Sequence, residues 1–351
     1  KKVVGALIED HETGSIIKVK SKTTIMAAGV WTDPLYEQFG LKPGYAVRMS
    51  KGAHIVVPGD AIKSETGVII KTDVSVLFII PWGDKWIVGT TDTDYDESRE
   101  EPLATSDDVT YIINQANRVL EPKLRRDQVI GVFAGLRPLV STDPDSPTTK
   151  LSREHVVDSP TQGFVSIAGG KYTTYRVMSE DAVNEAINHM RKIVPDSATE
   201  TLAIIGAEGY SVLMNQIPRL AQRFGISEFS VEHILNRYGS LIDELLEPAQ
   251  RDPSLLELVI PNLPYLKAEI LYSVTHEGAR SVDDVLSRRT RIAFEAHDQG
   301  LSVVADVAEL ISPILGWSAA ERKNSIAEYK EIIQRQNAEL IVAKKEKTKV
   351  S

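Results

Sequence analysis

A run of glycines, hydroxyl groups and one cation follows a short apolar stretch near the middle of the chain. Residues 163–176 read Gly-Phe-Val-Ser-Ile-Ala-Gly-Gly-Lys-Tyr-Thr-Thr-Tyr-Arg, so Gly169-Gly170 separates a predicted strand from a predicted helix. A helix N-terminus leaves backbone N–H groups without partners, and glycine lets a ligand approach the backbone closely. Lys171 and Thr173 add a cation and a hydroxyl there. The stretch predicts a site for a phosphate or an electron-rich ring edge, with a plain turn as the alternative.

A second candidate is the arginine in Gly135-Leu136-Arg137-Pro138, which is expected to end a strand over 129–134. The proline favours an extended backbone at Arg137 and therefore holds the guanidinium on a stiff segment. Arginine suits bidentate contact with a phosphate or a carboxylate. Pairing with Asp143 or Asp145, which follow closely, is the structural alternative.

Composition restricts the class of protein. The chain has 351 residues, 42% of them hydrophobic, and a formal net charge of −9, which gives no basic field for nucleic acid. It has no cysteine, which excludes disulfides and thiolate chemistry and fits a reducing, cytoplasmic setting. The histidines show no metal-ligand spacing, so no metal site is predicted. Because the chain begins at Lys1 in strand-like sequence, we expect an N-terminal part to be missing.

The elements that must position these residues change along the chain. A hairpin is predicted over 3–20, a buried strand that ends in Ala-Ala-Gly over 24–28, and antiparallel strands over 45–98, including one over 53–57. A helix is predicted over 106–120 with Ser106 as its cap. After about residue 195 helical periodicity dominates, and single helices are predicted over stretches such as 210–224, 281–286 and 318–340. The fold class is α+β.

Several short motifs, taken together and in order, resemble the FAD-dependent glycerol-3-phosphate dehydrogenases. They are 27–33 (Ala-Ala-Gly-Val-Trp-Thr-Asp), 51–57 (Lys-Gly-Ala-His-Ile-Val-Val), 80–82 (Ile-Pro-Trp), 89–92 (Gly-Thr-Thr-Asp), 135–138, 169–174, His276-Glu277 and 288–291 (Arg-Arg-Thr-Arg). The resemblance covers essentially the whole chain. The family's Gly-x-Gly-x-x-Gly turn, which holds the FAD pyrophosphate, is absent, so the chain resembles the C-terminal two-thirds of such an enzyme.

The resemblance implies a division into three parts. Residues 1–44 and 151–198 would form the remaining part of an FAD-binding α/β domain. Residues 45–150 would form an antiparallel-sheet substrate domain, and residues 199–351 an all-α C-terminal domain.

It also implies an activity: oxidation of sn-glycerol 3-phosphate to dihydroxyacetone phosphate, by hydride transfer to FAD and onward electron transfer to a quinone. Peripheral contact with the inner face of the cell membrane and a homodimer would accompany it. The lysine-rich tail over 344–349 is expected to be a solvated end, with a membrane-surface role as the alternative.

Residue roles follow from the same resemblance. Arg137, Arg153 and Lys171 would bind the substrate, and Arg137, Lys171 and His54 would be catalytic, with His54 as a candidate proton acceptor. A histidine in a strand is also compatible with a purely structural role. The residues expected to contact FAD are Gly29, Trp31, Gly135, Leu136, Gly169, Gly170, Lys171, Tyr172 and Thr173.

Three other functions are compatible with the same residues. An FAD-dependent amine or amino-acid oxidase would use Arg137 for a carboxylate. A glycerol-phosphate oxidase would differ in using oxygen as electron acceptor. A non-enzymatic helical interaction module over 200–351 is the third.

Overall fold

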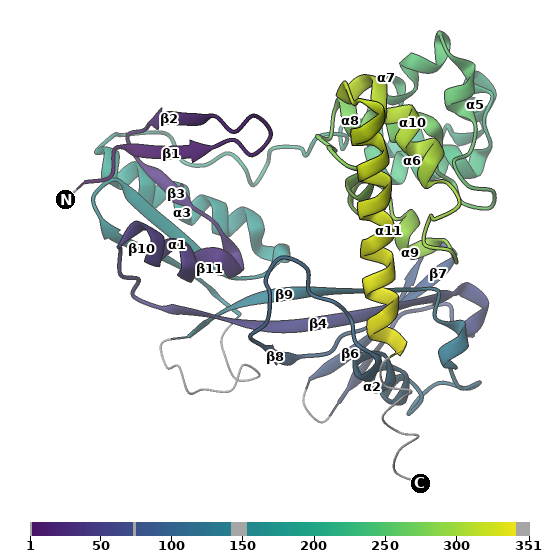
Figure 1. The fold of residues 1–351 in the computed structure, drawn as a ribbon, viewed down its shortest axis with the longest axis horizontal. Helices are drawn as coiled ribbons and strands as arrows, with labels where there is room; N and C mark the ends of the chain where they lie inside the picture. Colours follow the sequence, from purple (N-terminus) through teal and green to yellow (C-terminus); the bar gives the residue numbers. More distant parts are fainter. Residues whose placement is uncertain (1, 73–74, 142–152, 342–351) are drawn as a thin grey trace.

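The computed structural model describes residues 2–72, 75–141 and 153–341 and has mixed α/β architecture with a helical C-terminal region. Figure 1 shows the hairpin and a small sheet on one side, a long antiparallel sheet across the base, and the helical region above that sheet. Asp143, Asp145 and the lysine-rich tail lie outside the described residues. Within the described part, no helix is long and apolar enough to cross a membrane.

The small sheet carries the glycine pair. Its strand order is β10 (His155–Thr161), β11 (Phe164–Gly169) and β3 (Thr24–Met26), with β11 and β3 parallel. Helix α3 (Tyr175–Met190) packs against all three strands. The predicted hairpin is confirmed as β1 (Gly5–Glu9) paired with β2 (Ile16–Lys20).

The large sheet is built around β4 (Ala46–Pro58), which is far longer than the predicted strand over 53–57. Five further strands complete it: β5 (Val68–Lys71), β6 (Val76–Trp82), β7 (Lys85–Gly89), β8 (Thr93–Tyr95) and β9 (Gly131–Ser141). Strands β7 and β8 pair with successive parts of one edge of β4, and β9 pairs along the other edge over its whole length.

One face of this sheet packs into a hydrophobic core, and the opposite face carries the candidate site residues. Ala53, Ile55 and Val57 of β4 point into a core shared with helix α2 (Ser106–Ala116), where all three are almost fully buried. Since side chains alternate along a strand, Ser50, Gly52 and His54 point to the opposite face. The α2 cap is Thr105 rather than the predicted Ser106, because Thr105 Oγ1 accepts from Asp108 N at 3.2 Å.

The C-terminal region is helical, as predicted, but more finely divided. Its helical elements are α4 (Tyr210–Met214), α5 (Ile217–Phe224), α6 (Glu228–Tyr238), α7 (Ile242–Leu246), α8 (Lys267–Thr275), a π-helical turn (Asp284–Arg289), α9 (Ile292–Glu295), α10 (Val304–Leu315) and α11 (Ala319–Ile341). Helix α1 (Thr32–Phe39) belongs to the N-terminal part. The single helix predicted over 210–224 is thus two helices, and the one over 281–286 is a π-helical turn shifted towards Arg289.

Helix α11 joins the helical region to the large sheet. In Figure 1 it runs from the top of the helical region down to α2. Near its end, Gln336 exchanges two hydrogen bonds with the backbone of Ala104, at 3.3 and 2.8 Å, and Arg126 Nη2 donates to Leu340 O at 3.0 Å. The C-terminal region is therefore anchored to α2 and the segments beside it, which pack against the sheet that holds the candidate site.

Candidate active site on the open face of the large sheet

The pairing of β4 with β9 brings the predicted site residues onto one face. Ser50 lies opposite Arg137, Gly52 opposite Gly135, and His54 opposite Phe133. Directly opposed residues project to the same side of an antiparallel pair. The face therefore presents an arginine, then a gap at two glycines, then a histidine beside a phenylalanine.

The sequence predicted Arg137 at the end of a strand, but the structure places it inside β9. The next residue, Pro138, lies opposite Met49 of β4. The proline is tolerated because β9 pairs only with β4 among the described strands, so its outer edge needs no ladder hydrogen bond. Leu136 precedes Arg137 and is partly buried. A position inside a paired strand holds the arginine more rigidly than a strand end would.

The buried Asp92 forms ion pairs with both Arg137 and Arg153. The Asp92 side chain is 3% exposed; its Oδ1 accepts from Ser50 Oγ and lies 3.8 Å from Arg137 Nη1, while its Oδ2 accepts from Arg153 Nη2 at 3.1 Å. Arg137 also donates to Thr90 Oγ1 at 2.8 Å and to Thr91 O at 3.3 Å. These bonds leave the guanidinium fixed in place beside a second cation.

Burial and the nearby Arg153 lower the pKa of Arg137, and Asp92 opposes this shift. Burial is the largest of these effects. An arginine nevertheless stays charged in proteins. The site therefore holds two cations around one carboxylate, which leaves positive charge for an anionic ligand.

Gly52 and Gly135 leave a gap in the side chains on this face, and Arg137 fills the part of it over Gly52. A Cβ atom added at Gly52 would lie 2.3 Å from Arg137 Nη2, whereas one added at Gly135 would have no atom within 4 Å. The guanidinium therefore lies over Gly52, and the space above Gly135 is open. A flat ligand could approach the sheet there without meeting a side chain of β9.

We expect Gly52→Ala to displace Arg137 from Asp92 and Thr90 and to lower the free energy of unfolding by about 1–2 kcal/mol, because the displaced group loses its hydrogen bonds. Gly135→Ala is the matched control and should leave stability almost unchanged. Urea denaturation measures both. Adding Gly52→Ala to an Arg137→Met variant should cost much less; an equal cost would show that Arg137 does not occupy this space.

His54 lies at the other end of the gap. Its ring stacks on Phe133, with centroids 4.9 Å apart and planes 10° apart, and Gly89 makes room for it, since a Cβ there would lie 2.3 Å from His54 Cδ2. Its Nδ1 is buried and has no hydrogen-bond partner among the described residues. Burial first, and Arg137 second, lower the pKa of His54 to about 4. The imidazole is therefore neutral at pH 7.

This pKa predicts an acid-sensitive stability. Between pH of about 6.5 and about 4 the unfolded chain protonates His54 and the folded chain does not, so stability should fall as the pH falls through that window. The slope from this group should approach about 1.4 kcal/mol per pH unit. His54→Phe should flatten the profile from urea denaturation at pH 7 to 5, and His11→Gln at an exposed position should not. An unchanged slope in His54→Phe would contradict the prediction.

The glycine pair lies at the end of β11, as predicted, and both residues are required there. Gly169 has φ of 79° and Gly170 has φ of 77°, in the left-handed region that other residues rarely adopt. A Cβ on Gly169 would also lie 2.6 Å from Glu154 O and 2.8 Å from Val140 Cγ2 of β9. This close approach places the turn beside the strand that carries Arg137.

The residues that follow the turn are open to solvent. Lys171 and Tyr172 are exposed, and Thr173 lies in the short 3-10 helix Tyr172–Thr174 that starts α3. Lys171 N donates to Thr174 Oγ1 at 3.4 Å. The described residues show no ion pair between Lys171 and the Asp92 cluster.

Gly29 and Trp31 lie in another 3-10 turn, Gly29–Trp31, which comes two residues after β3 and leads directly into α1. This turn contacts both β9 and β11. Gly29 has open space where a side chain would be, and Trp31 is 42% exposed. The two turns after β3 and β11 thus lie near the same strand, β9.

The structure brings Arg137 and Arg153 together, places His54 on the same face as Arg137, and keeps Lys171 apart from their ion pairs. Asp92, Ser50 and Thr90 had no predicted role, although the motif over 89–92 contains two of them. A buried carboxylate cannot be recognised from its neighbours in sequence. Within the described residues, no cluster of His, Cys, Asp or Glu could hold a metal ion.

Comparison with known proteins gives a consistent family. Residues 1–176 match the family described as FAD dependent oxidoreductase, and residues 197–322 match the C-terminal domain of alpha-glycerophosphate oxidase. The chain is 43% identical over 328 residues to glycerol-3-phosphate dehydrogenase 2 of Mycobacterium tuberculosis, which covers 93% of this chain and 56% of the relative. It is 33% identical to the mitochondrial glycerol-3-phosphate dehydrogenase of Bos taurus, covering 93% and 45%.

A solved structure extends the match to the fold. The glycerol-3-phosphate dehydrogenase of Bacillus halodurans, complexed with FAD, superposes with a TM-score of 0.80 at 27% identity, over 95% of this chain and 66% of that one. The chain spans about half the length of the curated relatives it matches. It belongs to the family of FAD-dependent oxidoreductases, as a homologue of the FAD-dependent glycerol-3-phosphate dehydrogenases.

Proposed function

We propose that this chain supplies the substrate site of an FAD-dependent glycerol-3-phosphate dehydrogenase, which oxidises sn-glycerol 3-phosphate to dihydroxyacetone phosphate and passes the electrons to a quinone. The observation that carries the proposal is the pair Arg137 and Arg153, held by the buried Asp92 on the open face of the large sheet. The similarity to glycerol-3-phosphate dehydrogenases supports the choice of substrate.

The charges of this cluster suit a phosphate monoester. Two guanidinium groups around one carboxylate leave a net positive charge, and guanidinium groups bind phosphate oxygens through paired hydrogen bonds. Arg137 is held by Thr90 and Thr91, so little conformational entropy is lost when it binds. In this proposal Arg153, on an exposed segment, completes the phosphate contact, and Lys171 is a further cation for a substrate oxygen.

The residues around the gap fit FAD. The space above Gly135, the backbone of Gly169 and Gly170, and the open position at Gly29 would allow close approach of a flat ring and its sugar-phosphate chain. We propose that Gly135, Leu136, Lys171, Tyr172 and Thr173 would lie along the ring and that Gly29 and Trp31 would lie along the nucleotide side. When bound, FAD accepts the hydride from C2 of the substrate.

This chain's own residues would position the substrate and handle its proton. His54, neutral at pH 7 and without a partner at Nδ1, is the proposed acceptor of the hydroxyl proton. Arg137, on the same face and separated from His54 by the gap at Gly52 and Gly135, would orient the phosphate end. In the same proposal, residues 1–44 and 151–198 belong to the FAD-binding domain, 45–150 to the substrate domain and 199–351 to the C-terminal domain.

An absorbance spectrum tests the function. The purified protein containing this chain should show flavin bands between about 350 and 500 nm that survive gel filtration, and glycerol 3-phosphate should bleach them under anaerobic conditions. Glycerol without phosphate is the matched control and should bleach them far more slowly. Flavin that glycerol 3-phosphate leaves oxidised would overturn the proposed substrate.

Asp92→Asn should raise KM for glycerol 3-phosphate at least about tenfold with a smaller change in kcat, because both arginines lose the charge that holds them in place. Steady-state kinetics separates the two constants. Asp94→Asn is the control on the same segment, since Asp94 is largely exposed and contacts Arg48 at 3.6 Å. An unchanged KM in Asp92→Asn would remove Asp92 from the phosphate site.

A further inference from the structure

A separate cavity of about 680 Å³ lies between the large sheet and the helical region. It is lined by the turn between β6 and β7, by one side of α6, by Pro264 and Tyr265, and by two residues around α9, Arg291 and Glu295. None of the proposed active-site residues lines it. Its size is that of cavities that hold small organic molecules.

Most of the acidic groups around this cavity have a hydrogen-bond or ion-pair partner. Glu269 pairs with His233 Nε2 at 3.0 Å, and Asp84 pairs with Lys85 Nζ at 2.6 Å. Glu295 accepts from Tyr265 Oη at 3.2 Å, and burial raises the pKa of its carboxyl group. Glu232, the remaining carboxylate in the lining, is exposed to solvent.

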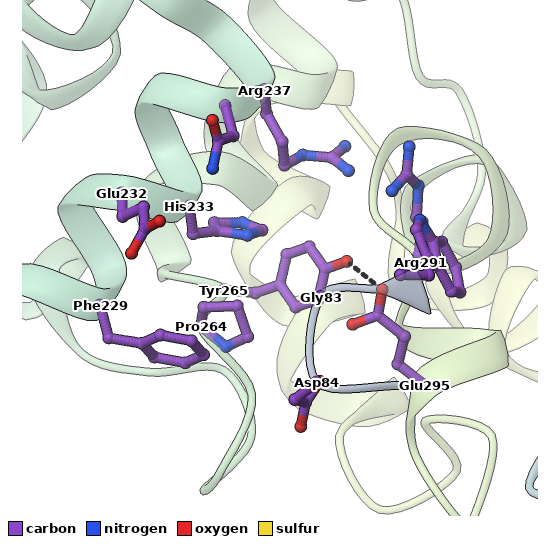
Figure 2. A pocket seen from close by; sticks show the side chains of 12 residues that line it. Gly83, Asp84, Phe229, Glu232, His233, Arg237, Pro264, Tyr265, Arg291 and Glu295 are labelled. Atoms are coloured by element: carbon purple, nitrogen blue, oxygen red, sulfur yellow. Dashed lines mark hydrogen bonds between the residues drawn. The ribbon is translucent and has the colours of Figure 1, made fainter. Parts of the chain in front are cut away.

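The two arginines of the cavity differ in their partners, since Arg237 has Glu269 nearby and Arg291 has no carboxylate partner among the described residues. Arg291 is exposed and lies over the Trp82 ring, 4.8 Å from its centroid, with no ion-pair partner among the described residues. Arg237 Nη2 donates to Arg289 O, but its Nε is buried without a hydrogen-bond partner, and the Glu269 carboxylate is 3.8 Å from it. In the view of Figure 2 the guanidinium groups of Arg237 and Arg291 lie above Tyr265, and the side chains of Asp84 and Glu295 lie below it.

We propose that this cavity binds a small organic anion, a phosphate or carboxylate group on an apolar body, through Arg237 and Arg291. The guanidinium group of Arg291, with that of Arg237 beside it, would hold the anionic group. The rings of Phe229, Tyr265 and Trp82 would cover the apolar body. The two arginines lie on different elements, α6 and the approach to α9, so a ligand would bridge them.

Isothermal titration calorimetry tests the site. Because an anion would also bind at the active-site arginines, the protein carries Arg137→Met and Arg153→Met, so that remaining binding reports the cavity alone. Phenyl phosphate and benzoate are the probes, and at least one should bind with Kd below about 1 mM. No heat from either probe would overturn the proposal and leave the proposed dehydrogenase function untouched.

Substitutions in the same background locate the binding. Arg291→Gln and Arg237→Gln should each weaken the bound probe at least about tenfold, as expected for a lost charge-assisted contact. Arg251→Gln, at an exposed position that pairs with Glu247, is the control and should have no effect. Arg291 is exposed, so its variant should fold normally even if Arg237→Gln does not.

Two outcomes would contradict the proposal. Probe binding that neither Arg291→Gln nor Trp82→Phe changes would place the anion elsewhere. Sedimentation with phosphatidylglycerol vesicles that depends on Arg291, without binding of either probe, would assign the surface to a lipid headgroup instead of a small anion.

Discussion

Arg137→Ala is expected to lower kcat/KM for glycerol 3-phosphate at least about 100-fold in the holoenzyme that contains this chain. Arg137 is fixed by Thr90, Thr91 and Asp92, so it would meet the substrate without reorganising. Alanine removes the charged contact and, among the residues that the structure describes, also leaves the buried Asp92 with only Arg153 as a cationic partner. Steady-state kinetics with a dye acceptor measures the loss.

Two variants make this result specific. Arg137→Lys keeps the charge but loses the paired donors, so it should recover only part of the activity. Arg125→Ala, at an exposed arginine that pairs with Asp127, should leave kcat/KM unchanged. Near-normal kinetics in Arg137→Ala, with flavin retained, would remove Arg137 from the substrate site.

Asp108→Ala is expected to lower the free energy of unfolding by about 3–5 kcal/mol, because it leaves the buried Lys51 without its counter-ion. Lys51 Nζ lies 2.8 Å from Asp108 Oδ2, and their side chains are 10% and 6% exposed. This pair joins β4 to α2 on the core side of the sheet, directly behind the open face. Urea denaturation monitored by circular dichroism measures the change.

The contribution of the ion pair can be separated from that of the helix cap, since Asp108 also accepts from Thr105 N at 2.9 Å. Asp108→Asn keeps a cap acceptor and removes the charge, so it should retain part of the stability. The double variant Lys51→Met/Asp108→Leu should be more stable than Asp108→Ala, because no unpaired charge remains buried. Asp127→Ala, which breaks a fully exposed pair, should have no measurable effect. A similarly small effect of Asp108→Ala would contradict the prediction.

Several local features of the fold were predictable from the sequence. The turn at Gly169-Gly170 follows from a strand, two glycines and a helix in order, and the structure places both glycines at positive φ. The hairpin, the antiparallel sheet and the capping of α11 by Ser318, whose Oγ accepts from Glu321 N at 3.2 Å, depend on neighbours in the chain. Such patterns are readable because turn chemistry, capping and periodicity act over a few residues.

The boundaries of elements were less predictable. Strand β4 extends to residues 46–58 because β9 pairs with it over eleven residues, and no local pattern records a partner so far along the chain. The π-helical turn Asp284–Arg289 and the division between α4 and α5 likewise reflect packing in the helical region.

By itself, the sequence indicated the candidate chemistry. It pointed to Arg137 and Arg153, to the turn at Gly169-Gly170, to His54 as a candidate proton acceptor, and to the family that these motifs resemble. Only the tertiary structure decided that Asp92 holds Arg137 and Arg153 together, and that Gly52 makes room for the guanidinium. It also decided that Arg237 and Arg291 share a cavity. The physical reason is that ion pairing, burial and close approach depend on distances between residues that are remote in the chain, and those distances are set by strand register and helix packing.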